Sequence, residues 1–187
     1  MKIKEQKIKG IYLLKPDIYK DNRGFFFESY NCKKLQNILG RKKFVQSNHS
    51  YSKKNVLRGI HFQKSKPQFQ LFYLIKGELD IFFVDLRPNS ITFKKNIFLN
   101  LKSETKFQLL TCPGIGTASH TKKNENIVIY YVSEIYNPKN ELGIMWNDKS
   151  LKLNWKCKKP IISKKDLSNK NFNDINFRKF KDLQNLI

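Results

Sequence analysis

Val56-Leu57-Arg58-Gly59-Ile60-His61-Phe62-Gln63 is the stretch around which the rest of the chain is organised. Side chains of a β-strand alternate between two faces, so Arg58 and Ile60 are expected on the face opposite His61. Gly59 has no side chain and would let a ligand or a second backbone come close. This arrangement would hold an imidazole in a pocket with a guanidinium at its rim. A lone histidine in an apolar strand is more often structural, however, so the octet alone does not decide the function.

Length and composition indicate one globular domain that spans residues 1–187. Hydrophobic residues make up 40% of the chain and aromatic residues 13%, which is enough for a substantial core. No apolar run approaches the roughly 18 residues of a membrane span, and residues 1–7 are not followed by the apolar segment of a secretory signal. Three widely spaced cysteines fit neither a disulfide framework nor a zinc site. We therefore expect a cytoplasmic protein that does not act on membranes.

The formal net charge of +22 raises the question of nucleic-acid binding. The excess is lysine, with 32 lysines against 5 arginines, whereas base and phosphate recognition relies on arginine forks. The lysines are spread along the chain, and 19 asparagines with a single alanine indicate an AT-rich coding sequence. We expect a lysine-rich solvated surface and no nucleic-acid partner. A basic protein would still favour a small anionic substrate.

The apolar pattern predicts many short strands and no long helices that alternate with them. The expected strands are 8–14, 25–30, 44–50, 56–62, 69–75, 79–84, 91–93, 97–101, 107–111 and 127–132. Lys76-Gly77-Glu78 predicts a hairpin between two of them, and residues 113–116 predict a tight loop. The three consecutive phenylalanines at 25–27 predict a strand buried on both faces or at an interface. This pattern is typical of an all-β sandwich or barrel.

Two short helices are expected beside the strands. Asn31 is suited to cap a helix that ends at Gly40. Near the other end of the chain, Phe177, Phe180 and Leu183 follow one another at three-residue spacing and predict a short helix that docks on the core.

Neither a metal nor a cofactor is expected from the motifs. His49, His61 and His120 lack the closely spaced carboxylate or second histidine of a metal site on a strand. The chain also has no Gly-x-Gly-x-x-Gly at a strand-to-helix turn and no P-loop, so nothing predicts a nucleotide held in those ways.

Acid–base chemistry is the reaction type that the remaining residues favour. A histidine held by a carboxylate is a good base near neutral pH, and a tyrosine across a pocket can return a proton to the other face of a carbon. That pairing suits inversion next to a carbonyl. The candidates are His61, the tyrosines around Tyr130, and acids such as Asp80, Asp85 and Asp166.

Several motifs in a fixed order resemble one family. They are Asp21 to Glu28, Phe44 to Ser50, Val56 to Gln63, Val84 to Arg87, Tyr130 through Pro138, Gly143 to Asp148 and Ser163 to Asp166. From about Ile11 to Asp166 the chain resembles the dTDP-4-dehydrorhamnose 3,5-epimerase family, small metal-free cupins that act on nucleotide-linked 4-keto sugars. The resemblance implies an all-β cupin, a jelly-roll or double-stranded β-helix with short flanking helices.

The resemblance also implies roles for individual residues. His61 matches the general base that removes the proton next to the ketone, Asp166 its carboxylate partner, and Tyr130 the acid that protonates the other face. Other positions match those that shape the sugar-nucleotide pocket, with the arginines suited to the diphosphate. These are Arg23, Phe25, Glu28, Gln46, Asn48, Arg58, Gln63, Gln70, Thr117, Tyr136 and Lys165.

A homodimer follows from the same resemblance. In the family the Arg-Gly-Phe-Phe segment of one subunit reaches the site of its neighbour, so the N-terminal strand is exchanged. Residues 25–27 would then belong to the interface between subunits.

Two positions depart from the family pattern. Gln70 stands where the family has a lysine that stabilises the enolate, and Thr117 stands at the histidine of the family's Gly-Phe-Ala-His-Gly-Phe loop, with His120 three residues on. A neutral amide donates a hydrogen bond but carries no charge, so some stabilisation of the enolate is expected to be lost.

The departures leave several alternatives open. One is a variant epimerase that inverts a single centre, including one that acts on a GDP-linked 4-keto heptose for capsule synthesis; another is a cupin that binds sugar nucleotides without catalysis. An isomerase that moves the ketone would carry a second histidine beside His61, where Phe62 and Gln63 stand. The sequence does not identify the nucleotide, the sugar, or whether carbon 3, carbon 5 or both are inverted.

Overall fold

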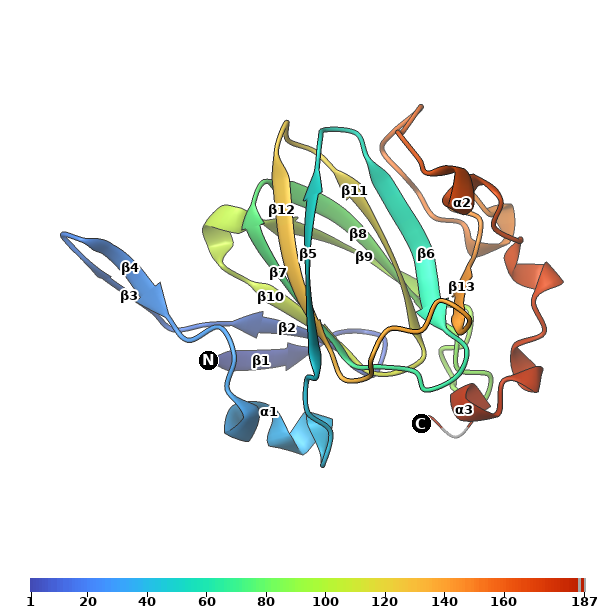
Figure 1. Ribbon diagram of the computed structural model, residues 1–187, viewed down its shortest axis with the longest axis horizontal. Helices are drawn as coiled ribbons and strands as arrows, with labels where there is room; N and C mark the ends of the chain where they lie inside the picture. Colours follow the sequence, from blue (N-terminus) through green and yellow to red (C-terminus); the bar gives the residue numbers. More distant parts are fainter. Residues whose placement is uncertain (185, 187) are drawn as a thin grey trace.

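Two antiparallel sheets face each other in the computed structural model, which describes residues 1–184 and 186 (Figure 1). The six-stranded sheet has the order β1-β2-β10-β7-β12-β5, and the five-stranded sheet has the order β13-β6-β11-β8-β9. The first contains β1 (Lys2–Glu5), β2 (Ile11–Lys15), β10 (Gln108–Thr111), β7 (Gln70–Lys76), β12 (Asn126–Val132) and β5 (Gln46–Ser52). The second contains β13 (Glu141–Gly143), β6 (Leu57–Gln63), β11 (Ile115–Thr121), β8 (Glu78–Asp85) and β9 (Asn96–Lys102).

The core between the sheets is apolar at one end. Nine buried side chains form it. Successive side chains of a strand point to opposite faces of the sheet, so every second residue points into the space between the two sheets. They are Ile8, Ile11, Leu74, Leu79, Ile81, Phe83, Leu101, Leu109 and Ile115. This core holds the two sheets together, and its residues Leu79, Ile81 and Leu101 also line a cavity between the sheets.

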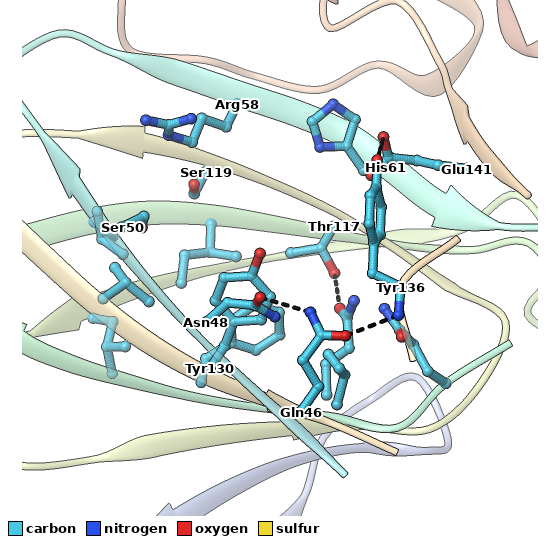
Figure 2. A pocket seen from close by; sticks show the side chains of 18 residues that line it. Gln46, Asn48, Ser50, Arg58, His61, Thr117, Ser119, Tyr130, Tyr136 and Glu141 are labelled. Atoms are coloured by element: carbon cyan, nitrogen blue, oxygen red, sulfur yellow. Dashed lines mark hydrogen bonds between the residues drawn. The ribbon is translucent and has the colours of Figure 1, made fainter. Parts of the chain in front are cut away.

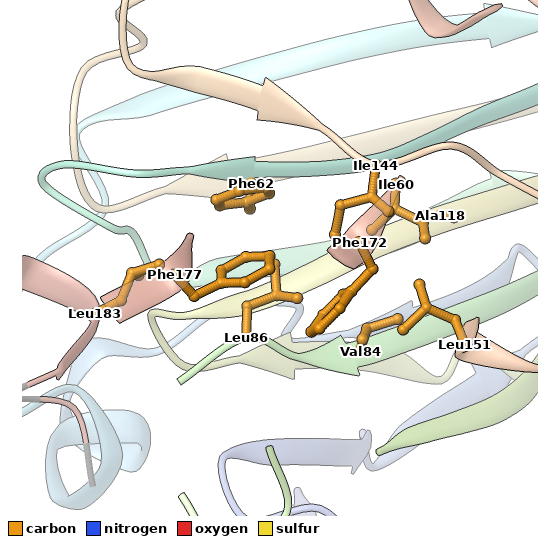
Figure 3. Close-up of a cluster of buried hydrophobic side chains, with 10 residues drawn as sticks. All are labelled: Ile60, Phe62, Val84, Leu86, Ala118, Ile144, Leu151, Phe172, Phe177 and Leu183. Atoms are coloured by element: carbon orange, nitrogen blue, oxygen red, sulfur yellow. The ribbon is translucent and has the colours of Figure 1, made fainter. Parts of the chain in front are cut away.

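The outer face of the five-stranded sheet is covered by the C-terminal tail (Figure 3). The rings of Phe172 and Phe177 have centroids 4.7 Å apart and are tilted by 30°, and both residues pack with Phe62 and Leu86. The expected docking of the tail is confirmed by Phe177 and Leu183, which are 3% and 0% exposed. The single helix expected there is wrong, since the tail forms the 3₁₀ turns Phe172–Asp174 and Phe177–Lys179 and the short helix α3 (Lys181–Gln184).

Helix α1 (Cys32–Leu39) covers part of the outer face of the six-stranded sheet. The side chain of Asn31 accepts hydrogen bonds from the backbone N–H groups of Lys33 and Lys34, and Gly40 follows the helix with a φ of 59°. Both predicted helix ends are therefore confirmed. The remaining short elements are the 3₁₀ turns Ser103–Thr105 and Lys149–Leu151 and the helix α2 (Lys164–Leu167).

The hairpin predicted at Lys76-Gly77-Glu78 is wrong. β7 and β8 do not pair with each other, because the chain crosses at Gly77 from the six-stranded to the five-stranded sheet. Gly77 has a φ of 102°, and a Cβ there would lie 2.4 Å from Oδ1 of Asn126. A glycine between two apolar runs thus marks a crossover that has the same local signature as a hairpin.

Three further expectations about strands are corrected. Residues 115–121 form β11 instead of continuing the loop that begins at Pro113, and residues 91–93 lie in a turn. The expected first strand at 8–14 begins only at Ile11, since residues 7–10 form a bend and turn after the separate strand β1.

A hairpin of β3 (Ile18–Asp21) and β4 (Gly24–Phe27) projects away from both sheets (Figure 1). The expectation that residues 25–27 are buried on both faces is wrong within this chain, because Phe25 is 54% exposed and Phe26 69%. Phe27 is the one that packs inward, with its ring 5.5 Å from that of Tyr73. The alternative of an interface strand remains a prediction.

Candidate functional site

A cavity of about 400 Å³ opens between the two sheets (Figure 2). Both sheets contribute to its walls, and polar and apolar side chains line it together. The lining residues are Gln46, Asn48, Ser50, Arg58, His61, Gln68, Gln70, Phe72, Leu79, Ile81, Leu101, Thr117, Ser119, Val128, Tyr130, Val132, Tyr136 and Glu141.

Asp166 in helix α2 holds the imidazole of His61 in β6. Nε2 of His61 lies 2.5 Å from Oδ1 of Asp166, and the side chain of Asp166 is only 4% exposed. Oδ2 of Asp166 accepts a hydrogen bond of 3.4 Å from the N–H of Gly59, and Ser163 caps the helix by accepting from the N–H of Asp166. The carboxylate thus fixes both the position and the orientation of the imidazole.

The pKa of Asp166 decides which imidazole nitrogen carries the proton. Burial opposes ionisation, but the hydrogen bonds from His61, Gly59 and Ser163 outweigh it and hold the pKa of Asp166 below its usual value. Near neutral pH the carboxylate is therefore ionised and can only accept, so Nε2 of His61 is the N–H donor. Nδ1 then keeps its lone pair and is the atom able to take a proton from a substrate.

The strict alternation expected for β6 does not hold. Arg58 and His61 both line the cavity, although three positions separate them. The register between β6 and β11 shifts, with Thr117 opposite His61 and Ser119 opposite Arg58, so β6 has one residue more than β11 between these pairs. Gly59 permits the close approach of β11, because a Cβ there would lie 2.4 Å from the carbonyl oxygen of Thr117. The second backbone predicted next to Gly59 is that of β11.

Tyr130 lies in β12, in the sheet that faces His61. Its ring stacks on Phe72 with centroids 5.7 Å apart and an interplanar angle of 29°. Burial raises the pKa of Tyr130, and the carboxylate of Glu141 raises it further while Arg58 lowers it. The phenol therefore stays protonated near neutral pH and can serve as a proton donor from the side opposite to His61.

Neutral side chains form one wall of the cavity. Nε2 of Gln46 donates to Oδ1 of Asn48 at 2.7 Å, and Oε1 of Gln46 accepts from the N–H of Tyr136 at 2.9 Å. The hydroxyl of Thr117 donates to Oε1 of Gln70 at 3.5 Å, which leaves the NH₂ group of Gln70 free to donate elsewhere (Figure 2). Both positions that depart from the family pattern thus lie in the cavity and contact each other.

Arg58 brings a guanidinium to the same cavity. Its Nε donates to Oγ of Ser52 at 3.1 Å, and one terminal nitrogen lies 3.5 Å from the carbonyl oxygen of Tyr51. Both partners belong to the edge strand β5, so Arg58 bridges the two sheets with donor capacity left for an anion.

Tyr136, Glu141 and Lys165 form a linked group at the cavity. The phenol of Tyr136 donates to Oε2 of Glu141 at 3.0 Å, and the ammonium of Lys165 forms an ion pair with the same oxygen. Sequence reasoning missed Glu141, which stands between two recognised motifs. β13 pairs with β6 so that Gly143 lies opposite His61 and Glu141 opposite Gln63, and only this pairing brings Glu141 to the site.

The other predicted substrate-binding residues lie outside the cavity lining. Arg23 and Phe25 belong to the projecting hairpin, where Arg23 pairs with Asp21 and its side chain is 85% exposed. Glu28 pairs with Lys34 at 2.7 Å, and Gln63 is buried in β6 at 8% exposure. A single chain therefore brings together the three predicted catalytic residues and most of the predicted pocket residues, whereas the hairpin residues Arg23 and Phe25 lie apart from them.

Sequence reasoning also missed Ser50, Gln68, Phe72 and Ser119 among the lining residues. Ser50 shares a strand face with Asn48, so strict alternation along β5 would have found it. Ser119 lies in β11, a strand that the sequence pattern does not predict.

Within residues 1–184 and 186, no cluster of three or more His, Cys, Asp or Glu side chains is arranged to hold a metal ion. Over the same residues, no helix has the length and apolarity needed to cross a membrane.

The family model described as dTDP-4-dehydrorhamnose 3,5-epimerase matches residues 5–174. A dTDP-4-dehydrorhamnose 3,5-epimerase of Salmonella typhimurium is 40% identical over 162 residues, covering 85% of this chain and 88% of that protein. One of Shigella flexneri is 36% identical over 179 residues, covering 95% and 99%.

Solved structures agree with this match. An epimerase of Legionella pneumophila in complex with dTDP-4-keto-L-rhamnose superposes with a TM-score of 0.90 at 31% identity, and the match covers 96% of each chain. An epimerase of Bacillus anthracis with TDP and pyrophosphate bound gives a TM-score of 0.87 at 37% identity, covering 91% of this chain and 98% of that one. The expected cupin fold is confirmed, and the chain belongs to the dTDP-4-dehydrorhamnose 3,5-epimerase family.

Proposed function

We propose that this chain is an isomerase that epimerises a nucleotide-linked 4-keto-6-deoxy sugar at the carbons next to the ketone. The observation that carries the proposal is the opposition of two groups across one cavity. His61, backed by Asp166, lies in one sheet, and the protonated phenol of Tyr130 lies in the facing sheet. Inversion at a carbon needs a base on one face and an acid on the other.

The reaction begins at Nδ1 of His61, which removes the proton from a carbon next to the ketone. The electron pair of the C–H bond forms the enolate, with the negative charge on the ketone oxygen. Tyr130 then gives its proton to the opposite face of the same carbon, and the ketone re-forms. Asp166 stabilises the imidazolium in between, since its buried carboxylate already accepts the Nε2 proton. Exchange with solvent returns both groups to their starting states.

The enolate oxygen needs a hydrogen-bond donor that is already in place. Gln70 fits this role, because its carbonyl oxygen faces the hydroxyl of Thr117 and its NH₂ group remains available. A neutral donor stabilises an oxyanion less than a lysine would. We therefore propose a slower enolisation than in relatives that carry the lysine.

The substrate proposed first is dTDP-linked. It is supported by the name of the family and by the bound dTDP-4-keto-L-rhamnose in the Legionella relative. The pocket offers Arg58 for the diphosphate, and the surplus of positive charge on the chain favours an anionic ligand.

The active unit proposed is a homodimer in which each hairpin of β3 and β4 completes the site of the other subunit. Two observations support it. The hairpin carries Arg23, Phe25 and Phe26 away from its own cavity, with both aromatic rings more than half exposed. In addition, α1 covers only part of the six-stranded sheet, so that Tyr51 is 51% exposed and Ile75 37%. A second copy would bury both apolar surfaces.

Proton NMR in deuterated water tests the function directly. The protein is incubated with dTDP-4-keto-6-deoxyglucose, and deuterium entry at carbon 3 and carbon 5 is followed together with the chemical shifts of the remaining protons, which distinguish the epimers. Entry at both carbons with inversion is expected. The absence of exchange in a folded protein that binds the nucleotide sugar would overturn the proposal in favour of a binding module.

The same experiment separates a second candidate. Thr117 and Ser119 both line the cavity, so the departure from the family's loop falls where the sugar would lie. Exchange at one carbon alone would show a variant that inverts a single centre. Exchange only with a GDP-linked 4-keto heptose would show the capsule-type variant.

A further inference from the structure

The segment that carries Asp166 is attached to β6 at two places. The first is the contact of Asp166 with Gly59 and His61. The second lies at the start of β6, where the N–H of Ile161 donates to the carbonyl oxygen of Asn55 at 2.7 Å and the N–H of Leu57 donates to the carbonyl oxygen of Ile161 at 2.9 Å. Because both attachments are to the same stretch, the second one sets where helix α2 stands relative to His61.

The side chain of Asn55 strengthens the second attachment. Its Nδ2 donates to the carbonyl oxygen of Lys159 at 2.7 Å, while its Oδ1 lies 2.9 Å from Nε2 of His120. The backbone of Asn55 has a φ of 66°, a left-handed conformation in which asparagine and glycine are the residues most often found. Asn55 therefore combines a special backbone conformation with hydrogen bonds to two distant segments.

These contacts determine which ring nitrogen of His120 carries the proton. A backbone carbonyl can only accept, so the amide atom facing Lys159 must be the NH₂ group, and Oδ1 must face His120. Nε2 of His120 consequently carries a proton, and Nδ1, which is buried with no hydrogen-bond partner among the described residues, is bare. Burial, followed by the charge of Lys122, holds the pKa of His120 below its usual value despite the nearby Asp80, in agreement with a neutral ring. His120 thus acts as a fixed donor that orients the amide of Asn55.

We infer that Asn55, oriented by His120, is a positioning residue for the proposed reaction. It holds residues 159–161 against the start of β6, and Asp166 follows this segment by five residues. Losing the amide would let α2 shift and would weaken the contact between Asp166 and His61 without touching the substrate pocket. The inference deepens the proposed function and rests on it for the kinetic effect, but the geometry is testable without any substrate.

The substrate-free test uses the ring protons of the three histidines. In protein labelled with ¹⁵N-histidine, the His61 proton shared with Asp166 is expected far downfield, as is usual for a short imidazole–carboxylate hydrogen bond. Asn55→Gly retains the left-handed backbone and removes the amide, and Asn55→Asp retains the acceptor for His120 but cannot donate to Lys159. Both variants should shift the resonance upfield or broaden it. Lys66→Gly, at an exposed position with a φ of 48°, is the matched control and should leave it in place.

The kinetic test measures deuterium exchange into dTDP-4-keto-6-deoxyglucose. Asn55→Gly should lower kcat by about tenfold with little change in KM, because the misplacement affects the base and not the pocket. In a protein that already carries Asp166→Asn, Asn55→Gly should lower kcat by less than about twofold, since a residue that acts through Asp166 loses its effect there.

The outcomes separate the two proposals. An unchanged downfield resonance in both Asn55 variants, or an equal loss of kcat with and without Asp166, would overturn the positioning role. Absence of exchange in the wild-type protein, together with a resonance that responds to Asn55, would instead overturn the proposed function and leave the positioning geometry intact.

Discussion

Oδ1 of Asp166 lies 2.5 Å from Nε2 of His61, although 105 positions separate the two residues in the chain. Replacing His61 by asparagine should lower the rate of exchange by about 10³-fold, the usual contribution of a general base. Asp166→Asn should lower it by about 10²-fold, because the amide cannot stabilise the imidazolium and favours the wrong tautomer. Deuterium incorporation followed by NMR measures both. Circular dichroism should show an unchanged fold, and exchange at the wild-type rate in His61→Asn would exclude His61 as the base.

Tyr130→Phe should separate proton removal from inversion. His61 lies in the opposite sheet and can still take the proton, so deuterium continues to enter the substrate from that face. Inversion needs the phenol, and we expect it to fall by about 10²-fold relative to exchange. NMR of the recovered substrate distinguishes the two, because exchange with retention leaves the chemical shifts of the remaining protons those of the starting sugar, whereas inversion changes them to those of the epimer. An equal fall of both rates would assign Tyr130 to binding instead.

Gln70→Lys should accelerate enolisation. A charged donor stabilises the enolate oxygen by about 1 kcal/mol more than the amide does, which corresponds to roughly a fivefold gain. Gln70→Ala removes the donor and should slow exchange by a similar factor. If Gln70→Lys is slower than wild type while Gln70→Ala is unchanged, the enolate is stabilised by another group, and Thr117 becomes the next residue to replace.

Mixed dimers test the exchange of the hairpin. Arg23→Ala and His61→Asn homodimers should both be nearly inactive. In a mixed dimer, the subunit that retains His61 receives Arg23 from its partner, so one site is complete. Equal mixing after dissociation should recover about a quarter of the wild-type activity, because half of the dimers are mixed and each has one working site. No recovery, in a mixture shown to form mixed dimers, would place Arg23 and His61 in the site of the same subunit.

The sequence predicted the strands better than the connections between them. Helix α1 was predictable because its signals are local, namely the cap at Asn31 and the glycine at position 40. The crossover at Gly77 was not, because the choice between a hairpin and a change of sheet depends on which partner each strand finds. β11 was missed for a similar reason, since it contains a glycine and an alanine, which are depleted in strands, and it is held by pairing on both sides.

The residues of the site were likewise predictable only in part, because some of them come together through long-range strand pairing. The resemblance to a family pointed to His61, Asp166 and Tyr130, and the fold brings them to one cavity region from three separate elements. Glu141 carried no signal of its own and joins the site only because β13 pairs with β6. Arg58 and His61 both line the cavity because of a shift of register between β6 and β11, which a simple alternation pattern does not predict.

The buried pair of Asp85 and Arg87 should make stability depend on acid pH. The two side chains are 0% and 3% exposed, and Asp85 accepts from Nε of Arg87 at 2.8 Å and from its terminal nitrogen at 2.7 Å. Burial opposes ionisation, but the hydrogen bonds from Arg87, Ser90 and Thr92 outweigh it and hold the pKa of Asp85 below its usual value. A carboxyl group with a lowered pKa stabilises the native state above the unfolded value of about 3.9, and that contribution is lost as the pH falls below it through the folded pKa.

Asp85→Asn tests this argument. Removing the charge leaves the guanidinium of Arg87 buried without a counter-ion, which should cost about 3–5 kcal/mol of unfolding free energy at pH 7. The carboxyl of the unfolded chain takes up a proton below its pKa of about 3.9, while the native carboxyl, with its lowered pKa, stays ionised to lower pH. The difference between the two proteins should therefore shrink as the pH falls below about 4. Urea unfolding followed by tryptophan fluorescence at pH 7, 5, 4 and 3 measures it. A difference that stays constant down to pH 3 would mean that the variant loses packing instead of a charge interaction.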